Sequence, residues 1–242
     1  LRGFTHLCET QEVARVFEDE DLLSAPVVSD SGQLLGRITV DDVIDVIRDQ
    51  ADRAIYGRAG LEQHPDMFAP VVRSSVKRAL WLGINLFTAF LAAWVIGLFE
   101  ASIEEVVALA ILMPVVASMG GVAGSQTLTL VTRALALDQI GRSNAPRLIW
   151  QELRIGLLNG LFWSWAVSAI AFLWFEDSWL GLVFGMAMMT VLFAGPLAGA
   201  LIPLILKRLS IDPALAGGVI LTTVTDIVGF ATFLGLATLL IL

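Results

Sequence analysis

Residues 216–241 read AGGVILTTVTDIVGFATFLGLATLLI, a run of 26 residues in which Asp226 is the only charged side chain. A helix needs roughly 20 mainly apolar residues to cross the hydrocarbon core of a bilayer. The run is therefore long enough to span a membrane. An ionised carboxylate near the bilayer centre costs about 3 kcal/mol or more, so we expect Asp226 to face a partner or a water-filled cavity.

Four further apolar runs precede this one along the chain. They cover residues 80–99, about 105–137, about 153–175 and 180–206. Hydrophobic residues make up 57% of the chain and charged residues 16%, whereas soluble domains carry about 25% charged residues. The sequence predicts an α-helical polytopic membrane protein with five transmembrane helices.

Basic residues between the spans occupy alternate loops, which predicts the orientation. Lys and Arg lie before the first span, between the second and third, and between the fourth and fifth (Arg73, Lys77, Arg78, Arg142, Arg147, Arg154, Lys207, Arg208). The other loops carry only acidic charges, at Glu100, Glu104, Glu105, Glu176 and Asp177. By the positive-inside rule, we expect a multi-pass protein of the bacterial cytoplasmic membrane with a cytosolic N-terminus and an external C-terminus.

Residues 1–50 have the pattern of a small cytosolic α/β domain. We expect a helix near residues 12–17, strands at 25–28 and 34–40, a turn at 30–33, and a helix at 42–52. Residues 1–60 hold six Arg and twelve Asp or Glu, a net charge of −6. This acidity argues against nucleic-acid binding. It suits either divalent cations or an ordinary solvated surface.

The remaining boundaries follow from composition. Residues 51–78 are polar and predict a connector helix, and residues 79–242 form the five-span domain. A single cysteine excludes an internal disulfide, and the N-terminus lacks the basic and apolar regions of a signal peptide. Because the sequence begins without Met, we expect it to be part of a longer protein.

Small and polar residues accompany Asp226 on one face of the last span. Their spacing of i, i+4, i+7, i+8 and i+11 places them together on a helix: Gly218, Thr222, Thr225, Asp226 and Gly229. The alternative is helix packing, with threonines bonding to i−4 carbonyls and Asp226 paired to a hydroxyl. No basic residue lies at mid-membrane depth to pair with Asp226, which favours a cavity-facing carboxylate.

The second span offers a comparable face, at spacings of four, three, four and four residues: Pro114, Ser118, Gly121, Ser125 and Thr129. Pro114 and the glycines at 120–124 are expected to loosen this helix and expose carbonyl groups, which requires cover by protein or water. Carbonyls and carboxylates are hard oxygen ligands that suit Mg²⁺ or Ca²⁺ rather than copper or zinc. One Asp per chain, doubled in a symmetric dimer, suits Mg²⁺, which keeps several waters.

Two segments resemble known families. The helix, strand, turn, strand, helix pattern of the first fifty residues resembles a single CBS domain, and Gly36, Thr39 and Asp42 match the CBS nucleotide motif. Helix capping explains Thr39 and Asp42 equally well. The stretches MPVVASMGG (113–121), GSQTLT (124–129), LKRL (206–209), IDPA (211–214) and TTVTD (222–226) resemble MgtE magnesium channels.

The MgtE resemblance implies a Mg²⁺-selective channel or transporter that is a homodimer, with a pore between the second and fifth spans of both chains. It implies that the Asp226 carboxylate faces hydrated Mg²⁺ and that the Thr222 carbonyl assists. It also implies cytosolic Mg²⁺ sites that close the pore, at Asp212, Asp21, Asp42 and Asp45. Further expected partners are membrane lipid and ATP at Thr39 and Asp42; Co²⁺ and Mn²⁺ stay open as additional ions.

Two positions depart from the family pattern near the proposed pore. Val122 stands where the family carries an asparagine, and Val219 where a proline is common, so the selectivity stays open. A proton- or cation-coupled carrier and a non-conducting membrane sensor also stay open. We expect no enzyme activity, because the sequence has no nucleophile–base pair, metal triad or phosphate loop.

Overall fold

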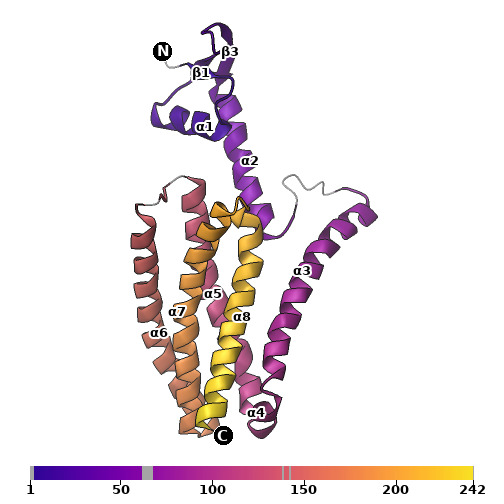
Figure 1. Ribbon diagram of the computed structural model, residues 1–242, viewed down its shortest axis with the longest axis vertical. Coiled ribbons are helices and arrows are strands. Elements are labelled where there is room, and N and C mark those ends of the chain that lie inside the picture. Colours follow the sequence, from indigo (N-terminus) through magenta and orange to yellow (C-terminus); the bar gives the residue numbers. More distant parts are fainter. Residues whose placement is uncertain (1–2, 62–67, 138, 142, 242) are drawn as a thin grey trace. The chain divides into compact units, whose positions relative to one another are not determined.

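The computed structural model describes residues 3–61, 68–137, 139–141 and 143–241, and the chain divides into two compact units, residues 1–69 and 70–242. Within the described residues, five helices are long and apolar enough to cross a membrane. They are α3 (Val71–Gly97), α5 (Ala108–Ala136), α6 (Ala145–Phe175), α7 (Ser178–Arg208) and α8 (Pro213–Leu240) (Figure 1). The predicted fold class, five spans and a small α/β domain, is confirmed.

All the long helices except α5 begin earlier than the apolar runs predicted. The α3 helix starts at Val71, directly after Pro70, and α6 starts at Ala145, with Pro146 in its first turn. Asp212 caps α8 by accepting a hydrogen bond from the Ala214 N–H at 2.8 Å. Caps and prolines set the ends of a helix, whereas hydropathy identifies only its apolar middle.

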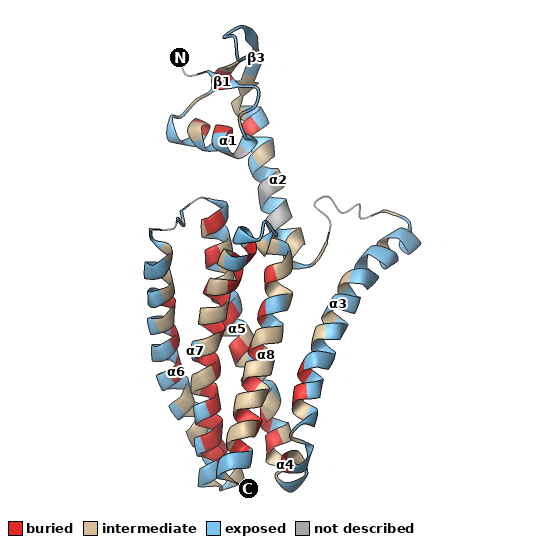
Figure 2. Cartoon of the chain, viewed as in Figure 1, coloured by how far each residue is buried: buried red, intermediate tan, exposed pale blue. Residues whose placement is uncertain are grey.

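Helix α7 lies at the centre of the second unit. It is the most buried of the five long helices, and α5, α6 and α8 pack against it (Figure 2). Glycines let the backbones approach closely, because a side chain in their place would not fit. If a Cβ atom were added to Gly195, it would lie 2.7 Å from the Gly120 carbonyl oxygen. A Cβ added to Gly156 would lie 2.7 Å from the Leu192 carbonyl oxygen. Such small-residue contacts are typical of membrane helix interfaces.

The glycine-rich stretch of α5 is regular helix. The helix runs without interruption from Ala108 to Ala136, through Pro114 and all three glycines at 120, 121 and 124. A Cβ at Gly120 would lie 2.6 Å from Val191 Cγ1, and one at Gly124 would lie 2.8 Å from Leu221 Cδ1. The prediction that this stretch loosens the helix is therefore wrong, because two of its glycines serve close packing.

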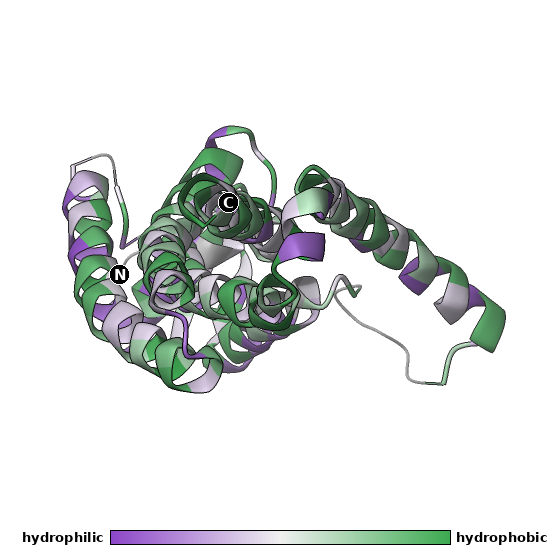
Figure 3. Ribbon diagram, turned by 90° about the horizontal axis from the view of Figure 1, so that it is seen from below, coloured by the Kyte–Doolittle hydropathy of each residue, from purple (hydrophilic) through white to green (hydrophobic). Residues whose placement is uncertain are grey.

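Helix α3 packs less tightly than its neighbours. Only Ala92 and Val95, in its C-terminal half, are buried, and the helix diverges from α8 toward its N-terminal end (Figure 1). The short helix α4 (Glu100–Glu105) follows it, and the Ser102 hydroxyl hydrogen-bonds the Thr238 hydroxyl of α8 at 2.7 Å. Large apolar side chains are exposed on α3 and α6, including Phe87, Trp94, Trp165 and Leu173. Much of the α3 ribbon has the green of hydrophobic residues in Figure 3.

The first unit contains a three-stranded sheet and two helices. The elements are β1 (Phe4–Thr5), α1 (Thr10–Asp19), β2 (Ser24–Val28), β3 (Leu34–Thr39) and α2 (Val40–Arg58). Strand β2 is central, parallel to β1 and antiparallel to β3. Apolar side chains from α1, α2 and the sheet form its core: Phe4, Val13, Ala14, Phe17, Ala25 and Val43.

The predicted connector differs from the observed backbone. Helix α2 continues from the small domain to Arg58, and Gly60 then adopts a positive φ of 66°. Residues 62–67 lie outside the described residues, and a new helix begins at Val71 after Pro70. Glycine in the left-handed region is a common way to end a helix, so the described parts of residues 51–78 do not form one helix.

Candidate functional site

Asp226 is half-buried on α8, four residues after Thr222 and eight after Gly218. Among the described residues, none is seen to donate a hydrogen bond to the Asp226 carboxylate or to form an ion pair with it. Thr222 is exposed, and a Cβ at Gly218 would meet nothing within 4 Å. These three residues therefore form one open stripe along α8, which we call the α8 stripe.

The threonines near Asp226 bond to the backbone of their own helix. The Thr222 hydroxyl donates to the carbonyls of Gly218 at 3.2 Å and Val219 at 3.0 Å. The Thr225 hydroxyl donates to the carbonyls of Leu221 and Thr222, both at 3.1 Å. Threonine hydroxyls that bond to carbonyls of the preceding turn were expected if this face served only helix packing. That alternative also expected a hydroxyl partner for Asp226, and these bonds do not supply one.

Thr225 and Gly229, which the helical spacing grouped with Asp226, lie on a different side of α8. Thr225 is only 1% exposed. A Cβ at Gly229 would lie 3.3 Å from Val116 of α5 and 3.4 Å from Val191 of α7. Both residues pack inside the chain's own helix bundle, so we leave them out of the α8 stripe.

The predicted face of α5 is open along its length. Pro114, Ser118 and Ser125 are exposed, and Gly121 and Thr129 are partly exposed. A Cβ at Gly121 would meet nothing within 4 Å. The Ser125 hydroxyl donates to the Val122 carbonyl at 2.9 Å. We call these five residues the α5 stripe.

The two stripes lie at the same depth. Four close contacts join α5 and α8, each between a glycine of one helix and a side chain of the other. The pairs are Val116 with Gly229, Gly120 with Thr225, Gly124 with Leu221, and Leu128 with Gly217. The residue numbers of each pair add to 345, so one antiparallel register covers all four contacts. In this register Asp226 is level with Met119, and Thr222 is level with Ala123. The Asp226 carboxylate therefore lies at the depth of the Ser118–Gly121 turn.

The acidic residues expected to bind regulatory Mg²⁺ have separate local positions. Asp21 follows α1 with a positive φ of 50°, and Asp45 is exposed on α2. Asp212 is the N-cap of α8, in the other unit of the chain. Within the described residues, no three His, Cys, Asp or Glu side chains come together as a metal-binding group.

Thr39 and Asp42 form a capping box at the start of α2. The backbone N–H and the hydroxyl of Thr39 both donate to Asp42 Oδ2 at 2.9 Å. The Thr39 backbone hydrogen bond, followed by the hydroxyl bond, lowers the pKa of the Asp42 carboxyl below its usual value. The local structure thus supports the capping interpretation of these two residues.

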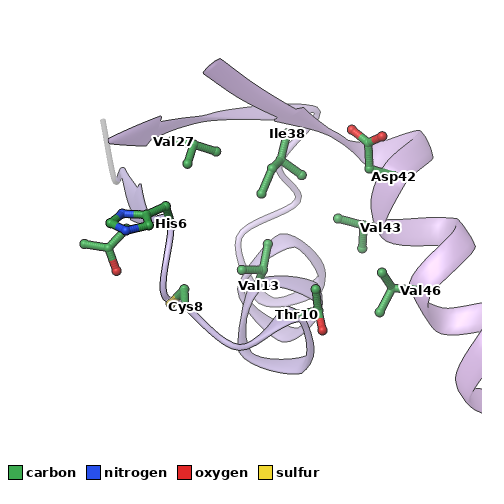
Figure 4. Close-up of a pocket in the computed structure, with 10 residues that line it drawn as sticks. His6, Cys8, Thr10, Val13, Val27, Ile38, Asp42, Val43 and Val46 are labelled. Carbon is green, nitrogen blue, oxygen red and sulfur yellow. The ribbon is translucent and has the colours of Figure 1, made fainter. Parts of the chain in front are cut away.

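Asp42 also borders a pocket of about 310 Å³ in the first unit. The pocket lies among α1, α2 and the sheet, and its lining includes His6, Cys8, Thr10 and Val46 (Figure 4). Thr39 is not part of this lining. Only one of the two residues predicted to bind nucleotide therefore borders the pocket.

One acidic residue within the helix bundle was not predicted from the sequence. Glu152 of α6 is 6% exposed, and it accepts a hydrogen bond from the Thr127 hydroxyl of α5 at 2.7 Å. The third apolar run begins near Leu153, so Glu152 falls one residue outside it. The glycines at 156 and 160, four and eight residues later, mark the packed side of α6 and could have signalled its burial.

Comparison with known proteins gives the family. The profile of the MgtE family, described as a divalent cation transporter, matches residues 113–236, which include most of α5, all of α6 and α7, and most of α8. The chain belongs to the MgtE family. It is 35% identical over 234 residues to the magnesium transporter MgtE of Bacillus subtilis (strain 168), covering 96% of this chain and 51% of that protein.

Two further MgtE relatives have similar identity. The magnesium transporter MgtE of Thermus thermophilus is 34% identical over 236 residues, and that of Enterococcus faecalis is 34% identical over 235 residues. The alignments cover 96% and 97% of this chain and 52% of each relative. The chain thus spans about half the length of the curated relatives it matches.

Family membership confirms several predictions. The MgtE resemblance is confirmed, as is a multi-pass membrane protein of a transporter family rather than an enzyme family. The matched region contains the whole α5 stripe and the whole α8 stripe.

Proposed function

We propose that this chain carries the ion pathway of a Mg²⁺ channel or transporter of the cytoplasmic membrane, with Asp226 as its cation-facing carboxylate. The observation that carries the proposal is the half-buried Asp226 on an open stripe, level with the small and polar residues of the α5 stripe. The relatives' name, magnesium transporter, supports Mg²⁺ as the ion.

The chemistry of the stripes supports a hydrated hard cation. Mg²⁺ gives up water reluctantly and is usually held through one or two carboxylates with several retained waters. Gly121 and Gly218 leave space beside the helix backbones, and the hydroxyls of Ser118 and Thr129 can bond to waters of hydration. The Thr222 carbonyl is a second proposed contact, although the Thr225 hydroxyl already donates to it at 3.1 Å.

The complete pathway needs a second chain in our proposal. A single Asp226 supplies one negative charge, and a symmetric dimer would place two around a shared axis. In this arrangement both stripes of each chain face the axis, and the apolar outer faces of α3 and α6 contact lipid. We further propose that the N-terminal unit is cytosolic and the C-terminus external.

Ion flux into proteoliposomes tests the proposal. Asp226→Asn keeps the side chain's size but removes the charge, so we expect Mg²⁺ uptake to fall about tenfold or more, because ligand charge sets affinity for such cations. Glu176→Gln, at an exposed C-cap, removes one charge elsewhere and should leave uptake unchanged. Normal uptake by a well-folded Asp226→Asn variant would show that the pathway is assigned to the wrong residue.

The same assay separates a channel from a coupled carrier. A channel conducts Mg²⁺ without a proton gradient, whereas a carrier that uses Asp226 for protons loses its flux when the gradient is collapsed by a protonophore. We expect uptake to persist with the protonophore. A non-conducting sensor would show no Mg²⁺ uptake in either condition.

We propose that cytosolic Mg²⁺ regulates the pathway through Asp21, Asp42, Asp45 and Asp212. Carboxylates that are brought together repel one another until cations bridge them, so in this proposal Mg²⁺ favours the compact state by binding it more tightly. Millimolar Mg²⁺ should then slow proteolysis of residues 51–58 in the full-length protein. Equal cleavage rates with and without Mg²⁺ would contradict this regulation, and adding ATP tests the proposed nucleotide at Thr39 and Asp42.

A further inference from the structure

A second pocket lies at the surface of the helix bundle, between α5 and α6 and over α7. Its volume is about 440 Å³. Four side chains with oxygen donors line it: Gln126, Thr127, Glu152 and Asn159. The rest of the lining is mainly apolar and includes Trp163, Leu192 and Pro196. The spacing of 152, 155, 156, 159 and 163 places one continuous face of α6 along the pocket.

Glu152 is the buried charge-bearing group of this pocket. It is 94% buried in a region whose neighbours are apolar helices, and one carboxylate oxygen accepts the Thr127 hydroxyl at 2.7 Å. Burying a carboxylate is costly unless a partner compensates its charge. Of the described residues, those that line the pocket include no Lys, Arg or His. The described lining of the pocket therefore contains the carboxyl group of Glu152 and no basic side chain to compensate its charge.

The other donors suit a hard cation. Gln126 and Asn159 each carry an amide carbonyl oxygen, and each is exposed rather than packed away. With Glu152 and Thr127, they form an all-oxygen set of one carboxylate, two amides and one hydroxyl. Such sets bind Mg²⁺, Ca²⁺ or Mn²⁺ rather than copper or zinc.

The pocket is large enough for an ion that keeps its waters. A water molecule occupies about 30 Å³ in the liquid, so an ion with six waters needs roughly 200 Å³, less than half of the volume. We propose that the α5–α6 pocket is a second cation site, which binds one hydrated divalent cation through Glu152, Asn159 and Gln126.

This site is separate from Asp226. In the α5–α8 register Asp226 is level with Met119, whereas Glu152 bonds to Thr127, eight residues further along α5. At 1.5 Å per residue, the two carboxylates differ in depth by about 12 Å. The pocket extends along α5 to Met119, at the depth of Asp226, but its lining uses a different face of α5, which includes Ala123 and Leu130 rather than Ser118 and Ser125. The second site does not depend on the proposed transport function.

Terbium luminescence tests the site on the whole chain in detergent. Tb³⁺ binds oxygen sites and emits when a nearby tryptophan transfers its excitation, and Trp163 lines the pocket. The background variant is Asp226→Asn, which removes the proposed pathway site and leaves the proposed regulatory sites, whose emission the substitutions below distinguish from that of the pocket. We expect tryptophan-sensitised emission that excess Mg²⁺ displaces. Emission that Mg²⁺ cannot displace would contradict a divalent-cation site.

Two substitutions assign the emission to the pocket. Glu152→Gln keeps a hydrogen-bond acceptor for Thr127 but removes the charge, and it should lower the affinity for Tb³⁺ and Mg²⁺ about tenfold or more. Trp163→Phe should reduce the emission without changing the Mg²⁺ affinity. Glu176→Gln is the matched control and should change neither. Unchanged emission in Glu152→Gln would mean that Glu152 serves only as a hydrogen-bond acceptor.

A further variant covers the case in which Glu152→Gln does not fold. Asn159→Leu removes an amide oxygen from an exposed position and leaves the Glu152–Thr127 bond in place. We expect it to elute as a folded protein in gel filtration and to bind Mg²⁺ about tenfold more weakly, as for loss of a supporting ligand. Full affinity in Asn159→Leu, together with full emission in Trp163→Phe, would overturn the proposal.

Discussion

Thr225 of α8 packs directly on Gly120 of α5: a Cβ built at Gly120 would lie 3.5 Å from the Thr225 Cβ. This contact belongs to the single register that joins the two helices, and it sets the depth of the neighbouring Asp226. A glycine is needed at position 120, because a Cβ there would lie 2.6 Å from Val191 Cγ1 of α7. The depth of the proposed cation-facing carboxylate therefore depends on a glycine that does not line the pathway.

Gly120→Ala should destabilise the helix bundle. Val191 is β-branched and fully buried, so it cannot move aside cheaply, and overpacking of this kind costs about 1–3 kcal/mol. Gly121→Ala is the matched control, since its Cβ meets nothing within 4 Å and alanine favours a helix over glycine by up to about 1 kcal/mol. Thermal unfolding in detergent compares the two variants. Equal stability would contradict the packing role of Gly120.

The capping box of the first unit should weaken in acid. Its hydrogen bonds lower the pKa of the Asp42 carboxyl, so the folded state favours the ionised form. The stabilisation is complete above the usual aspartate pKa of about 3.9 and is lost as the pH falls through the lower folded value. Wild type should therefore protect the first turn of α2 against hydrogen exchange better than Asp42→Asn at about pH 6, and this difference should shrink at about pH 3.

A neighbouring residue gives the control for this pH effect. Asp45 is exposed one turn further along α2, and in the described part of the structure its side chain has no capping bond. Asp45→Asn should leave the protection of the first turn unchanged at either pH. A difference between wild type and Asp42→Asn that does not change with pH would argue against an ionised capping carboxylate.

The spans could be predicted from the sequence because their signal is local. A run of about 20 apolar residues identifies a membrane helix whatever it packs against, and all five helices follow from this criterion. Their ends required more, since Pro70 and Asp212 act through caps rather than hydropathy. The family resemblance also rests on local motifs in α5 and α8.

The sequence did not show which residues of each polar helix face pack inward and which stay open. Helical spacing groups Thr225 with Asp226, but only the position of α5 and α7 shows that Thr225 packs inward. Gly120 and Gly121 are adjacent and identical in sequence, yet one is buried against Val191 and the other is open. The role of Glu152 likewise depends on Thr127, 25 positions away, a pairing that no local pattern contains.

Cysteine labelling should establish the orientation of the chain. With Cys8→Ser as background, Glu176→Cys places a thiol in the loop between α6 and α7, and Leu209→Cys places one after α7. The basic loops predict that position 209 is cytosolic and position 176 external. A membrane-impermeant maleimide should therefore label Glu176→Cys in intact cells and Leu209→Cys only after permeabilisation. The reverse labelling would invert the proposed topology.

Two threonines of α5 should respond in opposite ways to the same substitution. Thr127→Val removes the donor to Glu152 and leaves a buried carboxylate without its 2.7 Å hydrogen bond, which costs about 1–3 kcal/mol. Among the described residues, Thr132 Oγ1 is buried without a hydrogen-bond partner. Thr132→Val keeps the shape and removes that unpaired hydroxyl, so its stability should be unchanged or higher.

Thermal unfolding of the two valine variants, with and without Mg²⁺, is the measurement. Both substitutions lie on α5 five residues apart and change the side chain identically, so differences in helix propensity cancel. A cation bound at Glu152 would lessen the cost of Thr127→Val, because ligands that bind only the folded state stabilise it. Mg²⁺ should therefore raise the unfolding temperature of Thr127→Val. Equal destabilisation by the two substitutions would mean that the Thr127–Glu152 hydrogen bond contributes no net stability.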